Sequence, residues 1–169
     1  YHVEIIAGPC AVPFPSLAKV TKVTSTDQMA GAVMDAFPHC DLFFSTAAVL
    51  DLEFDSYFEE KVKKDSIQNQ IRFTETVDIL KTIGTQKKKN QFILGFAAET
   101  ENFTVNARKK LKSKNCDAVF VNPVKDSSSG FESDQNAGFL VTAKFTKEFK
   151  TKNKHALAQD ILKELKLAE

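Results

Sequence analysis

The residues of this chain that could do chemistry follow short apolar runs, where a strand would end. The run from Asp41 to Thr46 leads directly into Ala47 and Ala48, and Asp51 comes three residues later. Small residues allow a planar ligand to approach the backbone, and a carboxylate can accept hydrogen bonds from a ribose or an amino group. Asp51 could equally cap a helix or a turn, so the residues alone leave a binding role and a structural role open.

Two groups of lysines could bind an anion. Lys61, Lys63 and Lys64 lie in a long charged segment, where mobile cations could close over a polyphosphate and offset the charge on a transferred phosphorus. Lys110 and Lys114 lie one turn apart on a predicted helix and therefore share a face. Each group could also be a solvated surface, since short lysine clusters are common there and the helix is basic all round.

Three further segments offer groups that could bind a ligand. The segment from Thr76 to Leu80 begins a predicted helix, and the free amides of its first turn would make a seat for a phosphate. Phe96 lies in the segment from Gly95 to Thr100 and could stack on a base, although a place in the core suits it equally. Asn122 directly follows a predicted strand and could contact a ligand, but its spacing is not specific.

Several motifs with a known mechanism are absent from the sequence. It contains no G-x-G-x-x-G, no G-x-x-x-x-G-K-[ST], no H-E-x-x-H and no G-x-S-x-G. Its three histidines are scattered, which gives no support to a Ser-His-Asp mechanism or a histidine metal site. Cys10, Cys40 and Cys116 form no C-x-x-C pair, which argues against a disulfide framework or a zinc site. We therefore name no metal ligands from the protein.

The composition is that of a folded domain without a strong charge. The 169 residues are 43% hydrophobic and supply a core, and 23 basic against 22 acidic residues leave a net charge of +1. Such a balance gives no general attraction to nucleic acid or to an anionic membrane. No apolar run approaches the roughly 18 residues of a membrane span, and Tyr1 to Ile5 does not resemble a signal peptide. We predict a cytoplasmic protein with neither partner.

Alternating strands and helices must position the residues named above. Helices are predicted to begin at Thr26, at Thr76 and near Asn102, and a last helix carries Leu157, Ile161 and Leu165 at helical spacing. The pattern predicts an α/β, Rossmann-like three-layer domain with a mostly parallel sheet, in which ligands bind at the carboxyl ends of the strands. The predicted strands are Val3 to Ala7, Lys19 to Val23, Asp41 to Thr46, Ile71 to Phe73, Gln91 to Ala98 and Asp117 to Val121, followed by an antiparallel hairpin of Gly138 to Thr142 and Phe145 to Phe149.

The segment from about Leu52 to Gln70 does not fit this alternation. It carries Phe54, Tyr57 and Phe58 among many charges and has no steady period, so it is predicted to be a long loop. Loops of this length are usually functional, and we predict that residues 52–70 form an active-site flap. The lysines at 87–89 instead predict a solvated connection on the surface.

Together these segments resemble the phosphopantothenoylcysteine synthetases, in particular the bacterial kind that is often fused behind a flavin-dependent decarboxylase domain. The order and spacing of the motifs match over essentially all 169 residues. The most specific motifs are Gly95-Phe-Ala-Ala-Glu-Thr100, the pair Lys110 and Lys114, and Gly130-Phe-x-Ser-Asp-x-Asn136. The weaker matches are Ala7-Gly8-Pro9, Ala47-Ala48-Val49-x-Asp51, Lys61-x-Lys63-Lys64 and Thr76-x-Asp78-Ile79-Leu80.

The resemblance implies a phosphopantothenate–cysteine ligase of coenzyme A biosynthesis. In this family 4′-phosphopantothenate and CTP form an acyl-cytidylate with loss of pyrophosphate, and the amine of cysteine then displaces CMP. The mixed anhydride has a good leaving group, whose negative charge needs cations such as Lys and Mg²⁺. The resemblance therefore implies CTP, with ATP as the alternative nucleotide, and Mg²⁺ as cofactors, 4′-phosphopantothenate and cysteine as substrates, and a homodimer.

The resemblance also assigns roles to single residues. Lys61 matches the lysine of the mobile flap and is predicted to be catalytic, and Asn122 is predicted to bind substrate from its place after a strand. Val77 replaces the proline usual at its position, a change that should leave the phosphate seat intact. The predicted nucleotide-binding residues are Ser45, Thr46, Ala47, Asp51, Lys61, Val77, Asp78, Ile79, Leu80, Phe96, Lys110 and Lys114.

The chain departs from the family pattern at its beginning. The family normally starts with a Gly-Gly-Thr strand end and a Thr-Asn-x-Ser-Ser-Gly segment, and this sequence starts after them. We therefore predict a single synthetase domain over residues 1–169 that lacks its amino-terminal segment, and turnover that depends on that segment. Two other functions remain open, a non-catalytic nucleotide-binding module and a Rossmann-type NAD(P)-dependent oxidoreductase. The missing glycine fingerprint and the lysine-rich flap count against the oxidoreductase.

Overall fold

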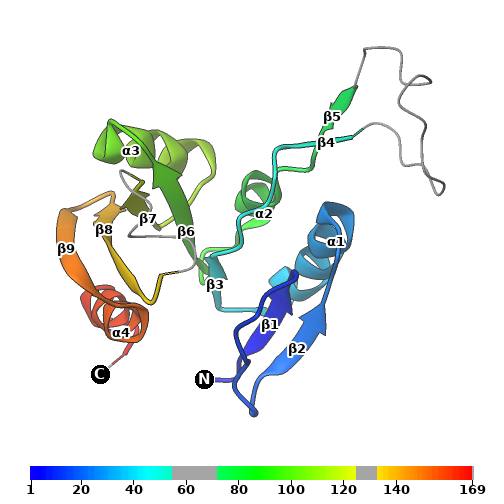
Figure 1. Cartoon of the computed structure of the whole chain (residues 1–169), viewed down its shortest axis with the longest axis horizontal. Helices are drawn as coiled ribbons and strands as arrows, with labels where there is room; N and C mark the ends of the chain where they lie inside the picture. The colour runs from blue at the N-terminus through cyan, green and yellow to red at the C-terminus, as the bar shows by residue number, and fades with distance from the viewer. Residues whose placement is uncertain (55–71, 125–132, 169) are drawn as a thin grey trace. The chain divides into compact units, whose positions relative to one another are not determined.

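The computed structural model describes residues 1–54, 72–124 and 133–168 of the chain (Figure 1). The chain divides into two compact units. One comprises Tyr1–Pro38 with Ala47–Ile79, and the other comprises His39–Thr46 with Leu80–Glu169. The prediction of a single domain over residues 1–169 stays a prediction.

The first unit begins with a parallel strand pair and a helix. Strand β1 (Glu4–Ala7) pairs with β2 (Lys19–Lys22), and α1 (Thr26–Ala36) packs against β1. The side chain of Ser25 accepts a hydrogen bond from the backbone amide of Gln28 and so caps the helix. The 3₁₀ helix η1 (Phe37–His39) follows. The two strands and the helix predicted for this region are confirmed, and the buried residues of α1 are Met29, Ala30 and Val33.

The first unit also contains an antiparallel ribbon of β4 (Leu52–Phe54) and β5 (Phe73–Glu75). Phe54 and Phe73 lie opposite each other in the ribbon, and their rings stack with centroids 5.2 Å apart. The prediction of a loop from Leu52 is therefore wrong at its start, because Leu52–Phe54 form a strand. All three residues are exposed, so no alternation of buried and exposed positions marked them. The rest of the predicted flap, including Lys61, lies outside the described residues.

The second unit is built on one sheet, which we call the main sheet. Within the described residues its strand order is β3-β6-β7-β8-β9. Neighbours in the first half, β3 (Leu42–Ser45), β6 (Phe92–Glu99) and β7 (Ala118–Pro123), run parallel. Strands β8 (Gln135–Thr142) and β9 (Thr146–Asn153) form an antiparallel hairpin that pairs with β7. The predicted α/β class is confirmed, as is the hairpin, which is longer than predicted.

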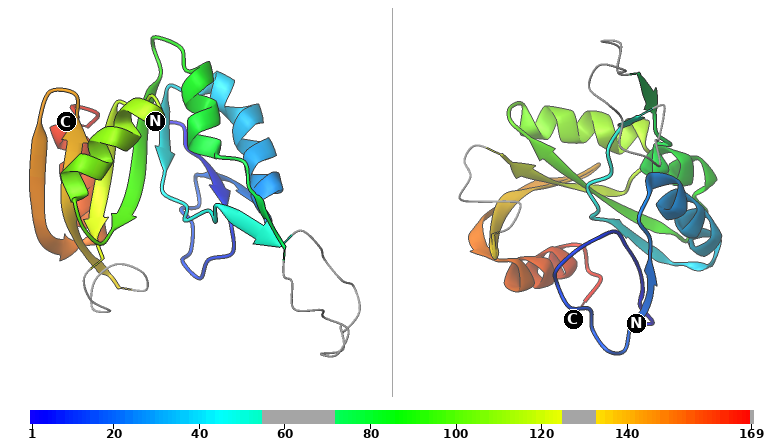
Figure 2. Two further views of the ribbon diagram at one scale, coloured as in Figure 1. Left: turned by 90° about the horizontal axis from the view of Figure 1, so that it is seen from above. Right: turned by 45° about the vertical axis from the view of Figure 1, so that its right-hand side comes forward.

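Helices cover both faces of the main sheet. Helix α3 (Phe103–Ser113) packs on β7 and β8 from one side, and α4 (Lys154–Glu164) packs on β8 and β9 from the other, as the right-hand view of Figure 2 shows. A third helix, α2 (Ile79–Gln86), precedes β6. The apolar stripe predicted for the last helix is confirmed, since two of its members join the core. That core consists of Leu94, Ala118, Phe120, Leu140, Phe149, Leu157 and Ile161.

Two local predictions in this region are wrong. Thr76 does not cap a helix, because α2 begins at Ile79 and the Thr76 hydroxyl donates a hydrogen bond to the carbonyl of Leu50. Lys87 is not a solvated surface residue, since its Nζ lies 2.6 Å from Oδ2 of Asp117 and its side chain is only 13% exposed. The same carboxylate oxygen accepts a hydrogen bond of 2.7 Å from the backbone amide of Ile93. Asp117 thus joins Lys87 to the start of β6.

None of the helices in the described residues is both long enough and apolar enough to span a membrane.

Candidate functional site

The carboxyl ends of the parallel strands β3, β6 and β7 lie along one edge of the main sheet. Ser45 is the last residue of β3 and pairs with Gly95, and Asn122 of β7 pairs with Ala98 of β6. Phe96 lies between these two levels. Three of the predicted ligand-binding residues, Ser45, Phe96 and Asn122, are therefore found on neighbouring strands near the edge at which such sheets bind ligands.

These three residues do not point to the same face of the sheet. Side chains alternate along a strand, and residues paired across a parallel ladder share a face. Ser45 therefore shares its face with Gly95, which is the face covered by α3. Phe96 and Asn122 point to the other face, where α4 packs. A ligand that contacts all three would have to cross the edge of the sheet.

Phe96 combines the two roles that the sequence left open. Its ring is half-buried, packs against the core and lies 5.7 Å from the ring of Phe120. The contact with Phe120 therefore supports the interpretation of Phe96 as a core residue. The part of the side chain that remains accessible, near the carboxyl end of β6, is what a stacked ligand could use.

Asn122 carries a buried oxygen without a donor. Its Oδ1 atom is inaccessible and makes no hydrogen bond within residues 1–54, 72–124 and 133–168. A buried acceptor without a hydrogen bond lowers the stability of the fold by about 1–3 kcal/mol, so such atoms usually have a donor. The residue is only partly buried as a whole, and it stands near the carboxyl end of β7.

The paired lysines stand at the carboxyl end of α3. Lys110 lies in its last turn, and Lys114 is the C-cap, whose backbone amide donates to the Lys110 carbonyl. Burial, and next the charge of Asp117, raise the pKa of the Cys116 thiol to about 11, while Lys87, Lys110 and Lys114 act to lower it. Three ammonium groups therefore lie close enough to Cys116 to act on one thiol. Lys87 is already paired with Asp117, and the three lysines stand on the side of the amino ends of β6 and β7.

The amino end of α3 is fixed to the end of β6 by residues that the sequence did not single out as a pair. The amide Nδ2 of Asn106 donates to Oε2 of Glu99 at 2.9 Å and to the carbonyl of Glu101 at 3.3 Å. Glu99 is the acidic residue of the motif from Gly95 to Thr100. The structure gives this carboxylate a partner on the next helix, which no local spacing could have indicated.

In the first unit, the backbone joins two of the predicted nucleotide-binding segments. The carbonyl of Asp51 accepts a hydrogen bond of 3.0 Å from the amide of Thr76, so Asp51 lies beside the segment that leads into α2. Val77 is 45% exposed, and Asp78 immediately precedes the helix. Ile79 is buried, so its backbone, not its side chain, is the group that could meet a phosphate.

The remaining predicted residues are distributed between the two units. Leu80 packs over the main sheet, with its Cδ2 only 3.1 Å from the place where a Cβ on Gly95 would stand. Thr46 and Ala47 are both exposed, and they fall in different units although they are consecutive. The meeting of all predicted nucleotide-binding residues in one site stays a prediction.

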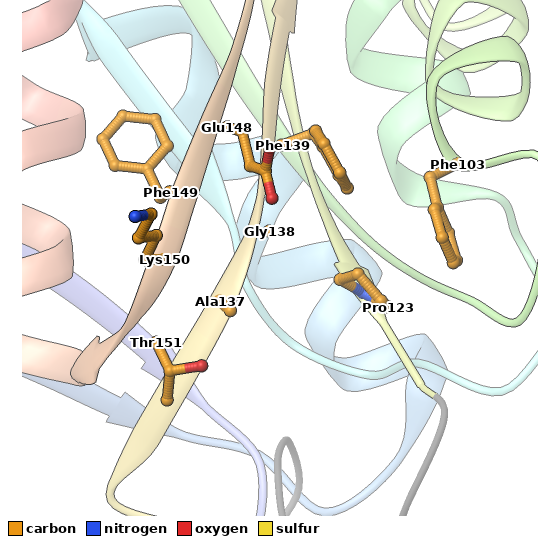
Figure 3. A pocket seen from close by; sticks show the side chains of 9 residues that line it. All are labelled: Phe103, Pro123, Ala137, Gly138, Phe139, Glu148, Phe149, Lys150 and Thr151. Carbon is orange, nitrogen blue, oxygen red and sulfur yellow. The ribbon is translucent and has the colours of Figure 1, made fainter.

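The second unit also has a cavity of about 390 Å³ beside the carboxyl end of β7 (Figure 3). It is lined by Phe103 of α3, Pro123 of β7, and the hairpin residues 137–139 and 148–151. The rings of Phe103 and Phe139 stack 6.0 Å apart beside it. None of the predicted site residues lines this cavity. In the described part of the chain, no group of three His, Cys, Asp or Glu side chains could hold a metal ion.

An α/β unit with polar groups near the carboxyl ends of its parallel strands is of the class that binds small ligands at that edge. Residues 1–167 match the family model described as the DNA/pantothenate metabolism flavoprotein C-terminal domain. The chain belongs to this family. The resemblance that the sequence motifs indicated is therefore confirmed at the level of the family.

Similar proteins of known name support this membership. The chain is 40% identical over 136 residues to the coenzyme A biosynthesis bifunctional protein CoaBC of Bacillus subtilis (strain 168), covering 80% of the chain and 33% of that protein. It is 31% identical over 167 residues to the protein of the same name from Escherichia coli (strain K12), covering 97% and 41%. The chain thus spans less than half the length of these two relatives.

A solved structure supports the fold. The crystal structure of the C-terminal domain of coenzyme A biosynthesis bifunctional protein CoaBC superposes with a TM-score of 0.79 at 29% identity. The match covers 98% of this chain and 74% of that chain. The α/β architecture expected from the alternation of strands and helices is that of this domain.

Proposed function

We propose that this chain provides the phosphopantothenate–cysteine ligase activity of coenzyme A biosynthesis. The observation that carries the proposal is the family match over residues 1–167, together with relatives whose names place them in coenzyme A biosynthesis. The proposed reaction has two steps. CTP first activates the carboxylate of 4′-phosphopantothenate as an acyl-cytidylate and releases pyrophosphate, and the amine of cysteine then attacks the acyl carbon to give the amide and CMP.

The negative charges of this reaction suit the two lysines at the carboxyl end of α3. A triphosphate brings several negative charges, and its cleavage adds charge to the departing pyrophosphate, so cations positioned in advance favour both binding and reaction. Lys110 and Lys114 supply such cations from α3. Lys61 is proposed to add a third from the flap, as the catalytic lysine.

The start of α2 is proposed to bind the nucleotide phosphates. The first backbone amides of a helix have no partner inside the helix and carry a partial positive charge. Val77, Asp78 and Ile79 lead into this end, and Asp51 lies beside them through its hydrogen bond to Thr76. Ser45, Thr46, Ala47, Leu80 and Phe96 complete the proposed nucleotide site.

Mg²⁺ is proposed to arrive with the nucleotide. The ion usually keeps several waters and binds through substrate phosphates and one or two carboxylates, without a dedicated protein cage. When bound, Mg²⁺ would neutralise phosphate charge, and Asp51 and Asp78 are the carboxylates near the proposed phosphate seat.

Asn122 is proposed to bind the acyl substrate. Its buried Oδ1 has no donor within the described residues, whereas 4′-phosphopantothenate has hydroxyl and amide groups that donate hydrogen bonds. We also propose a homodimer and a cytoplasmic location, the state and place expected of this family's metabolic enzymes.

The proposal is tested with the complete product of the gene that encodes this chain. Pyrophosphate release should require both CTP and 4′-phosphopantothenate, and mass spectrometry should find phosphopantothenoylcysteine only when cysteine is added. CTP binding without any product would instead favour the nucleotide-binding module. An NAD(P)H absorbance change with a reducible substrate would favour the oxidoreductase. Parallel titrations with CTP and ATP decide the nucleotide.

A further inference from the structure

The last turn of α2 touches the carboxyl end of α3, and we call this contact the α2–α3 junction. It consists of Gly84 on α2 and of Lys114 and Asn115 at the end of α3. Asn115 donates a hydrogen bond of 2.8 Å from its Nδ2 to the carbonyl of Gly84. The junction lies wholly in the second unit and directly beside the predicted nucleotide-binding Lys114.

Gly84 is needed because the two backbones lie very close together. A Cβ placed on residue 84 would stand 2.0 Å from the carbonyl oxygen of Lys114 and 2.8 Å from its carbonyl carbon. Real Cβ atoms do not come this close to backbone atoms, so any larger residue would push the two helices apart. Because glycine has no Cβ, α2 can lie this close to the backbone of Lys114.

Asn115 ends α3 in a defined geometry. Its φ of 52° lies in the left-handed region that asparagine tolerates, and its amide donates to the Lys112 carbonyl. The amide of Cys116 donates to the Leu111 carbonyl. These two bonds form a Schellman motif, which terminates the helix. The side chain of Asn115 then continues to Gly84, so one residue both ends α3 and attaches it to α2.

We infer that Asn115 is a positioning residue for nucleotide binding, which acts by fixing the end of α3 that carries Lys110 and Lys114. Lys110 is linked to the junction because its carbonyl accepts the Lys114 amide. Without the bond to Gly84, the end of α3 would keep its own backbone bonds but lose its attachment to α2, and the two ammonium groups would lose their fixed position relative to that helix. The inference rests on the proposed role of these lysines.

Asn115→Gly is the variant that tests this most cleanly. Glycine adopts a positive φ easily, so the helix end is retained while the side-chain bond is lost. The Kd for CTP should rise about two- to tenfold, the range that corresponds to the net contribution of one hydrogen bond. The Kd for 4′-phosphopantothenate should stay unchanged.

Asn102→Gly is the matched control. Asn102 also has a positive φ, of 50°, and stands at the other end of the same helix, but its side chain makes no capping hydrogen bond. This variant should bind CTP like the parent. Equal weakening by both variants would show a general loss of helix order and would overturn the positioning role.

A double-mutant cycle separates positioning from simple stability. Asn115→Gly should have no further effect on CTP binding in a chain that already carries Lys110→Ala and Lys114→Ala, because it acts through these lysines. Additive losses would overturn the inference. If the lysine variant alone bound CTP normally, the proposed nucleotide role of the lysines would fail as well. Weakened binding by the lysine variant, with normal binding by Asn115→Gly, would overturn only the positioning role.

Discussion

The main sheet has a parallel half, β3, β6 and β7, and an antiparallel half, β8 and β9, and the lysines of the two halves have different surroundings. In the antiparallel half, Lys147 and Lys152 of β9 pair with Glu164 and Asp160 of α4, and they line an exposed edge strand. Charged residues on such an edge discourage pairing with another chain. In the parallel half, Lys87 pairs with Asp117, and Lys110 and Lys114 stand at the carboxyl end of α3.

The cavity does not follow the charge. It lies against the hairpin, Phe103 and the carboxyl end of β7, whereas Lys110 and Lys114 stand at the other end of α3, before the amino end of β7. This cavity and the cationic groups that the motifs select therefore stand at opposite ends of the parallel strands.

The largest effect is expected from the lysines of α3. Replacing Lys110 and Lys114 with alanine should weaken CTP binding about tenfold for each charge-assisted hydrogen bond lost, and about a hundredfold for both. Replacing Lys147 and Lys150 of β9, one of which lines the cavity, should leave CTP binding unchanged. Isothermal titration of both variants measures the difference. The reverse pattern would place the nucleotide in the antiparallel half.

A glycine at the border of the two halves should control stability. A Cβ on Gly138 of β8 would stand 2.3 Å from the Val121 carbonyl and 2.8 Å from the ring of Phe120, beside an irregularity in the β8–β9 register. Gly138→Ala should therefore lower the free energy of unfolding by about 1–3 kcal/mol, measured with urea. Gly31→Ala is the control, since nothing lies within 4 Å of its Cβ. It should stabilise α1 by about 0.5–1 kcal/mol.

Asn122 should affect substrate binding without harming the fold. Asn122→Ala removes a buried acceptor that has no donor within the described residues, so thermal unfolding should stay level or shift upward. The KM for 4′-phosphopantothenate should rise about two- to tenfold, the loss of one hydrogen bond. A large fall in melting temperature with an unchanged KM would make Asn122 a structural residue.

The smallest effect concerns pH. Burial and Asp117 raise the pKa of Cys116 to about 11 in the folded chain, from an ordinary value of 9.0. The unfolded thiol therefore loses its proton first, and stability should decline as the pH rises from about 9 to about 11. Cys116→Ala should remove part of this decline in urea titrations at several pH values. An identical pH profile would contradict the shift.

The sequence predicted the elements whose signals are local. The stripe of α1, the apolar run that becomes β7 and the hairpin after residue 135 all follow from period and turn residues, and all are present. The site residues predicted near the carboxyl edge rest on motif order, because none has a specific spacing alone, and their role stays a prediction.

The missed features depend on partners distant in the sequence. Strand β4 exists because β5 pairs with it, and both are exposed, so no alternation marks them. In the sequence, Lys87 is one member of a lysine run that predicts a solvated surface, and only the fold brings Asp117 beside it. The hydrogen bond from Asn115 to Gly84 joins residues 31 positions apart, so no local sequence pattern could predict it.

The most direct test of the proposed ligase is isotope exchange between pyrophosphate and CTP in the absence of cysteine. An acyl-cytidylate forms reversibly, so labelled pyrophosphate should enter CTP only when 4′-phosphopantothenate is present. The complete gene product should therefore show exchange that depends on this carboxylate, and the Lys110→Ala, Lys114→Ala variant should lose it. No exchange in the presence of CTP, Mg²⁺ and 4′-phosphopantothenate would contradict the account.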